Sequence, residues 1–154
     1  MAITEDILIR CQQVLEEAAV LLEGGQKITL DEINAKRKAS NIASKAAFLL
    51  LKKAFITPFD REDIWSFQQA CESVKEAAQE VAFAKKIFLE GANACRALAL
   101  ATEQLLHSSD IDITLLFNIE RQFKTTPPLP MFRDLLRCGQ NAVFCLEHLS
   151  LKNS

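Results

Sequence analysis

The chain has 154 residues, of which 49% are apolar and 25% are charged, and its formal net charge is −2. This length fits a single domain, and four Gly with four Pro are too few turn residues for a β-sandwich or a β-barrel. The small net charge gives no reason to expect a nucleic-acid partner. We therefore expect one helical domain over residues 1–154.

Three features bear on the compartment. The longest apolar run, Ala46–Leu51, is far shorter than the ~20 residues that span a bilayer, so we expect a soluble chain that is not inserted in a membrane. Glu5 and Asp6 lie where a signal peptide would carry positive charge. The five cysteines form no Cys-x-x-Cys pair, which favours reduced core thiols and a cytoplasmic location. They are Cys11, Cys71, Cys95, Cys138 and Cys145.

The first predicted helix begins near Thr4 and ends at Gly24-Gly25, since glycine reaches the left-handed conformation at helix ends without steric cost. Its apolar residues recur in alternating steps of four and three, which gives an apolar seam of period 3.5. They are Ile7, Cys11, Val14, Ala18 and Leu21. A second helix begins at the capping box in residues 29–32 and ends by Thr57, because Pro58 disfavours a helical residue before it.

The third predicted helix has the same start signal, with Asp60 as the cap and Phe59 and Ile64 as the hydrophobic staple. Its seam is also regular and comprises Ile64, Phe67, Cys71, Val74, Ala78 and Val81. We expect Gly91 to break or bend the path before a fourth helix over residues 93–107.

A fifth helix is expected over residues 109–124, capped by Ser109 or Asp110, and a sixth over residues 131–149. Gly139 lies inside the sixth, where glycine costs about 1 kcal/mol relative to alanine, so we expect a close helix crossing there. Short loops favour antiparallel neighbours. The expected fold class is all-α, an antiparallel up-and-down bundle of six helices.

Catalytic signals are sparse. The sequence contains no P-loop, GxGxxG, HExxH or GxSxG motif. Its two histidines, His107 and His148, lie near predicted helix ends, where a cation complements the helix dipole. We predict that the chain is not an enzyme and needs no cofactor.

Carboxylates offer one alternative. Glu72 and Glu76 have the spacing of a carboxylate metal site, and Glu120 could join them from another helix. No Glu-x-x-His accompanies them, and solvated helix faces explain the same acids. We therefore predict no metal site and keep these three as weak candidates.

The second predicted helix carries an unusual charge pattern. Between Glu32 and Asp60 there is no acid, and Lys38, Lys45 and Lys52 repeat every seven residues. The three lysines therefore share one stripe, called the basic stripe below. It could bind an anionic surface, or it could face the acids of the neighbouring helices.

Residues 55–64, Phe-Ile-Thr-Pro-Phe-Asp-Arg-Glu-Asp-Ile, closely resemble the junction of helices two and three in PhoU-like proteins of the Pit accessory branch, which are regulators of phosphate transport. The resemblance implies two antiparallel three-helix halves, a cytoplasmic location and association with a membrane phosphate permease or its regulator. Its central residues are called the junction motif below. They are Pro58, Phe59, Asp60, Arg61, Glu62 and Asp63.

The chain departs from the family pattern at its acidic motifs. Family members carry Glu-x-x-x-Asp on helix two, where this chain has Lys36 and Ser40, with Lys38 between them. Cations at these positions would repel a bound dication. On the third helix, Ser73 replaces an acid that the family often has.

The second half departs in the same way. The acidic motif of the fifth helix is reduced to Glu120, and Gln140-Asn141 lies where the family often has Glu-Asp. Amides keep the shape of these side chains and lose the charge. The resemblance therefore predicts a PhoU-like bundle that has lost the family metal cluster.

We interpret the chain as a regulatory protein that acts through contacts with other proteins. Two alternatives remain: a metal-binding bundle, possibly a phosphate-handling enzyme, built on Glu72, Glu76 and Glu120, and a self-assembling structural bundle. Long apolar seams often leave one face uncovered, so we expect a homo-oligomer.

Overall fold

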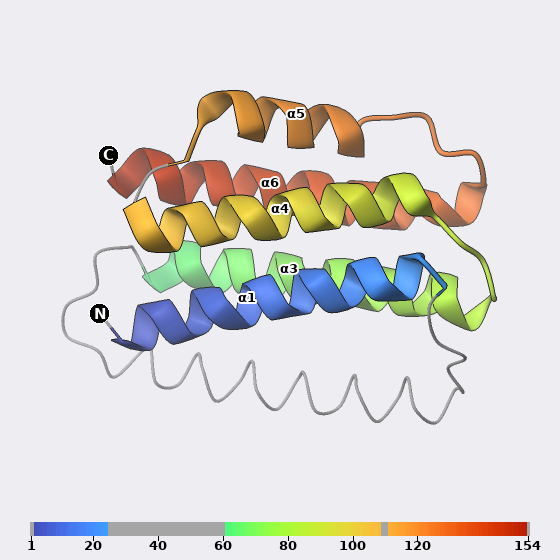
Figure 1. Ribbon diagram of the computed structural model, residues 1–154, viewed down its shortest axis with the longest axis horizontal. Coiled ribbons are helices and arrows are strands. Elements are labelled where there is room, and N and C mark those ends of the chain that lie inside the picture. The colour runs from blue at the N-terminus through green and yellow to red at the C-terminus, as the bar shows by residue number, and fades with distance from the viewer. Residues whose placement is uncertain (1, 25–60, 109–110, 154) are drawn as a thin grey trace.

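The computed structural model describes residues 2–24, 61–108 and 111–153 (Figure 1). Over these ranges the chain is helical and contains no strand, which confirms the all-α prediction. The helices are α1 (Ala2–Leu22), α3 (Arg61–Phe83), α4 (Leu89–Ser108), α5 (Ile113–Phe123), the 3-10 helix η1 (Pro130–Phe132) and α6 (Arg133–Asn153).

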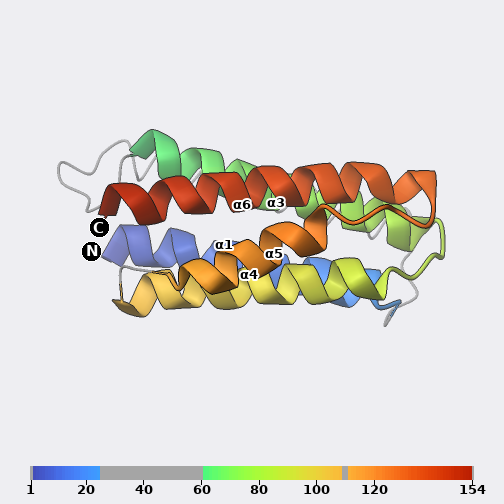
Figure 2. The ribbon, with the colours of Figure 1, turned by 90° about the horizontal axis from the view of Figure 1, so that it is seen from above.

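The four long helices lie side by side in a bundle. Helix α1 packs against α3 and α4, and α6 packs against α3 and α4. Seen from above, α6 lies over α3, and α4 lies over α1, while the shorter α5 crosses from α4 to α6 (Figure 2). Helices α4 and α6 run opposite to α1 and α3 (Figure 1).

The predicted seams form the core. All five seam residues of α1 are buried, and so are all six of α3. The regular spacing fixes this outcome, because steps of three and four keep side chains on one face of a helix. Burying each large aliphatic side chain contributes about 1.5–3 kcal/mol. The predicted seams of the first and third helices are therefore confirmed.

Gly91 neither breaks nor bends the chain before the fourth helix. Helix α4 begins at Leu89, so Gly91 lies in its first turn. A Cβ at Gly91 would stand 2.8 Å from Cδ2 of Leu135 on α6 and 2.6 Å from Cδ2 of Phe88. The glycine allows a close approach between packed elements, and the predicted break was wrong.

Helix α5 begins later than predicted. Asp112 is its cap, and Oδ1 of Asp112 accepts a hydrogen bond from the Thr114 N–H at 2.9 Å. Ile111, just before the cap, is buried. Helix α6 begins at Arg133 after η1 and continues to Asn153, beyond the predicted end at residue 149.

Several predicted features lie outside the described residues. They are the second predicted helix, the basic stripe of Lys38, Lys45 and Lys52, and the first part of the junction motif, Pro58, Phe59 and Asp60. Among the helices that the structure does describe, none combines the length and the hydropathy that crossing a bilayer requires.

Candidate functional site

Helix α3 carries a row of buried polar residues next to its apolar seam. Gln68, Glu72, Lys75 and Gln79 follow one another in steps of four, three and four, and their exposed fractions are 2%, 6%, 5% and 1%. Burying polar groups is costly unless hydrogen bonds or opposite charges compensate them. We call these four residues the polar row. Which groups compensate their burial decides whether the row can bind a ligand.

Helix α1 supplies charges that match the centre of the polar row. Arg10 Nη2 lies 3.7 Å from Glu72 Oε1, and Glu17 Oε2 lies 2.6 Å from Lys75 Nζ. Arg10 and Glu17 are two turns apart on α1, so both ion pairs bridge the same two helices. Each pair brings one cation and one anion, and the centre of the polar row is therefore electrically balanced.

The two ends of the polar row are amides. Gln68 Nε2 and both side-chain polar atoms of Gln79 are buried and have no hydrogen-bond partner in the part of the chain that the structure describes. Most buried polar groups in proteins are hydrogen-bonded. The amide ends are therefore the places where the polar row has unused hydrogen-bonding capacity.

A cavity of about 400 Å³ opens beside Lys75. Its charged lining comes from Glu16 and Glu17 of α1, Lys75 of α3 and Arg96 of α4. Arg96 also forms an ion pair with Glu23 at the end of α1. Two carboxylates and two cations share this lining, so the cavity suits a polar group of mixed charge more than a bare metal cation.

The three metal candidates do not converge. Glu72 faces Arg10, while Glu76 is exposed and Glu120 lies on α5, where its Oε1 accepts a hydrogen bond from Lys124 Nζ at 2.6 Å. Helices α3 and α5 do not pack against each other. Within the described ranges, no three His, Cys, Asp or Glu side chains form a group that could hold a metal ion.

Two residues that stand where PhoU-like proteins often carry acids, Ser73 and Gln140, have hydrogen-bond partners in this bundle. The Ser73 hydroxyl donates to the Gln69 carbonyl on its own helix at 3.0 Å. Gln140 Nε2 donates to the Phe123 carbonyl at 2.9 Å, which joins α6 to the last turn of α5. Gln140 therefore holds two helices together through a neutral hydrogen bond.

The described part of the junction motif forms the start of α3. Arg61 is its first residue, Glu62 is exposed and Asp63 is half-buried. Acidic residues in a first turn are stabilised by the positive end of the helix dipole. These two acids therefore have a local structural role.

A second cavity, of about 480 Å³, lies between α3 and α6, and sequence analysis missed it. Helix α3 contributes Asp63 and Trp65, and helix α6 contributes Phe144, Cys145 and His148 to its lining. The rings of Phe144 and His148 are 4.9 Å apart. The spacing of four residues between Phe144 and His148 indicates that they share one face of a helix. Nothing in the sequence indicates that this face lies next to the only tryptophan, Trp65.

Four of the five cysteine thiols are not poised as nucleophiles. Burial raises the pKa of Cys95 to about 12, and burial is also the main cause that raises the pKa of Cys71 well above its usual value, with a hydrogen bond to Cys11 adding to it. Burial likewise raises the pKa of Cys138 and Cys145. These thiols stay protonated at neutral pH, and the thiolate is the reactive form.

Comparison with known proteins adds no relative. No protein-family model matches this chain, and no curated protein is similar to it at a significant level. The resemblance at residues 55–64 therefore depends on those ten residues and on the helical layout around them.

Proposed function

We propose that this protein is a PhoU-like accessory protein that regulates phosphate transport by binding other proteins. The observation that carries the proposal is the ion pairing of the polar row, in which α1 matches Glu72 with Arg10 and Lys75 with Glu17. A balanced row joins two helices and leaves no converging negative charge for a dication. The family resemblance supplies the role, and the helical bundle supplies the scaffold.

The finer architecture belongs to the same proposal. It comprises six helices in two antiparallel three-helix halves, a cytoplasmic location and assembly into a homo-oligomer. The packing of the described helices, α1 on α3 and α4 and α6 on α3 and α4, supports a bundle of this type. The proposed partner is a membrane phosphate permease or a protein that regulates one.

The partner-binding surface in this proposal is the basic stripe of Lys38, Lys45 and Lys52. Three like charges on one stripe would attract an acidic surface, and this attraction should weaken as the salt concentration rises. The direct test is capture of a phosphate permease by the purified protein, with Lys38→Glu and Lys45→Glu combined in one variant.

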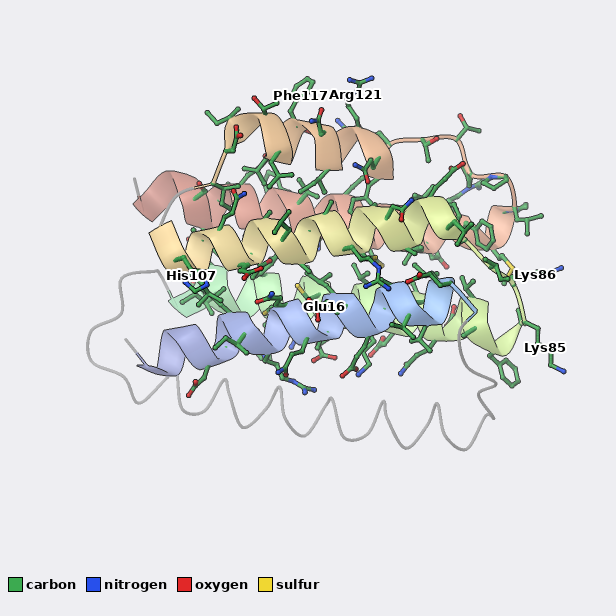
Figure 3. All side chains as sticks on the ribbon, viewed as in Figure 1. Glu16, Lys85, Lys86, His107, Phe117 and Arg121 are labelled. Atoms are coloured by element: carbon green, nitrogen blue, oxygen red, sulfur yellow. The ribbon has the colours of Figure 1, made fainter. Side chains whose placement is uncertain are left out.

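The control variant reverses the same number of charges elsewhere. Arg121 lies on α5 and Lys124 is its C-cap residue; both are exposed, and Arg121 points away from the bundle (Figure 3). We expect the stripe variant to lose capture and the Arg121→Glu, Lys124→Glu variant to keep it. Equal loss in both variants would mean that overall charge, and not the stripe, governs capture.

Elemental analysis separates this proposal from the metal-binding alternative. We expect untagged protein to carry no stoichiometric iron, zinc or nickel, since carboxylate sites gain affinity from several converging oxygens. About one transition metal per chain, removed by Glu72→Gln, would favour the metal-binding bundle built on Glu72, Glu76 and Glu120.

A further inference from the structure

The turn between α3 and α4 exposes large apolar side chains. Phe83, Ile87 and Leu89 have exposed fractions of 51%, 59% and 59%, although they lie within seven residues of one another. The turn forms the end of the bundle opposite the N- and C-terminal ends (Figure 1). Exposed apolar clusters of this kind mark surfaces that bind something.

Two cations accompany these apolar side chains. Lys85 and Lys86 are exposed and project beyond the end of the bundle (Figure 3). Neither forms an ion pair with any described residue, and residues 83–89 contain no acid. Glu90, the next acid, lines a cavity with Asn118 and Arg121 of α5. The turn is therefore positively charged as well as apolar.

Lys85 is held in a backbone conformation that normally favours glycine. Its φ is +58°, and it is the only non-glycine residue with a positive φ in the described chain. The Lys86 N–H donates to the Val81 carbonyl at 3.1 Å and the Lys85 N–H to the Ala82 carbonyl at 3.0 Å, which is a Schellman helix end. A cation at a glycine position has a conformational cost, and such strain is a pointer to function.

The turn is anchored to the rest of the bundle. Phe88 is buried, its N–H donates to the Leu22 carbonyl at 2.8 Å, and its ring stacks on Phe132 at a centroid distance of 4.2 Å. A Cβ at Gly24 would stand 2.9 Å from Cγ1 of Ile87, so the end of α1 also supports the turn. The exposed side chains are thus presented on a fixed base.

We propose that this turn docks on the anionic surface of a lipid bilayer. We call it the tip and define it by Phe83, Lys85, Lys86, Ile87 and Leu89. The three apolar side chains would enter the headgroup region, and the two ammonium groups would contact lipid phosphates. A lysine near an anionic surface raises the partition coefficient on the order of fivefold. Because the tip has only two lysines and three apolar side chains, we expect its binding to be reversible.

The shape and the charge of the tip favour a bilayer over a protein. It is a protruding turn of seven residues, whereas a specific protein interface involves about 20–30 residues on each side. A second copy of the tip would bring four lysines together, and like charges repel. This inference stands independently of the proposed phosphate role.

The test measures flotation of the full chain with phosphatidylcholine vesicles that contain or lack phosphatidylglycerol. We expect binding only to the phosphatidylglycerol vesicles, with weaker binding at higher salt. Lys85→Gln with Lys86→Gln should lower the partition coefficient by roughly 25-fold, at about fivefold per charge. Phe83→Ser with Ile87→Ser should abolish flotation.

The matched control alters an equally exposed aromatic and cation elsewhere. Phe117 and Arg121 lie on the outer face of α5, away from the tip (Figure 3). Phe117→Ser with Arg121→Gln should leave flotation unchanged. Equal loss in this variant, or equal flotation with neutral vesicles, would overturn the proposal.

Lys85→Gly separates a role of this lysine in vesicle binding from a purely structural role. Glycine relieves the positive φ, so the melting temperature should rise, while the lost charge should weaken vesicle binding about fivefold. Lys85→Arg should keep binding. If Ile87→Ser instead converted a dimer to a monomer and no variant changed flotation, the tip would be an interface between copies and the proposal would be wrong.

Discussion

The ring of Phe123 at the end of α5 lies directly against Gly139 in the middle of α6. A Cβ at position 139 would stand 2.7 Å from Cγ of that ring, closer than a real Cβ approaches a neighbouring heavy atom. Both residues are buried. The predicted close crossing at Gly139 is confirmed, and the aromatic ring explains why the helix tolerates glycine there.

Gly139→Ala should destabilise the protein in spite of the better helix propensity of alanine. The propensity gain is about 1 kcal/mol, whereas inserting an atom into a packed contact costs typically 1–3 kcal/mol. We expect a net loss of about 1 kcal/mol in urea unfolding. Asn141→Ala, at an exposed position of the same helix, should stay within about 0.5 kcal/mol of the parent. A gain of stability in Gly139→Ala would show that Phe123 moves aside freely.

Glu17→Gln should weaken the contact between α1 and α3, because it removes the carboxylate 2.6 Å from the buried Lys75 ammonium. Breaking a fully buried pair costs about 3–5 kcal/mol. Since half of the Glu17 side chain is exposed, we expect about 1 kcal/mol in urea unfolding. Glu16→Gln, on the exposed face one residue away, should have almost no effect. Combining Glu17→Gln with Lys75→Met should recover part of the loss, and strict additivity would contradict the pairing.

Glu147→Gln should stabilise the protein at neutral pH and lose this advantage in acid. Burial raises the pKa of Glu147 above its usual 4.5, the Glu120 charge raises it further, and Lys124 and His148 oppose the change. A raised pKa in the folded state means that folding favours the protonated acid. The parent therefore loses stability as pH rises through the folded pKa, and the variant does not. The melting temperatures of both proteins, measured as the pH rises through the folded pKa of Glu147, test this prediction. A difference between the two melting temperatures that does not change with pH would contradict it.

Thiol labelling should divide the cysteines into two groups. Cys138 and Cys145 are half-buried, whereas Cys11, Cys71 and Cys95 are fully buried. We expect two thiols to react with an aromatic disulfide reagent in the native state, slowly because burial raises the pKa of each. The other three should react only after unfolding in denaturant. Rapid native labelling of Cys95 would mean that α4 opens locally.

The core was predictable because it depends on local periodicity. The seams of α1 and α3 follow from spacing alone, and each seam residue is buried as expected. The start of α5 was less predictable, since Ser109, Asp110 and Asp112 are all good capping residues within four positions. Local capping preferences do not choose among these three residues. Asp112 is the cap and Ile111 is buried because of how this segment packs on the rest of the bundle.

The polar row was predictable only in part. We expected solvent around Glu72 and Glu76, which is right for Glu76 and wrong for Glu72. Glu72 is buried because Arg10, distant in the sequence, reaches it from α1. Gly91 was misread for a similar reason, since a helix break and a close contact both favour a residue without a side chain. The proposed phosphate role, partner and oligomeric state stay predictions.

The pairing of α1 with α4 has a consequence for the protein while it is being synthesised. The Gln12 side chain contacts Glu103, a residue 91 positions later in the chain. At about 5–20 residues per second, translation needs roughly 4–17 s between the end of α1 and the end of α4. Throughout that interval, the side of α1 that packs against α4 lacks this partner. A chaperone that binds exposed apolar helices would be able to bind α1 during this interval, before α4 is complete.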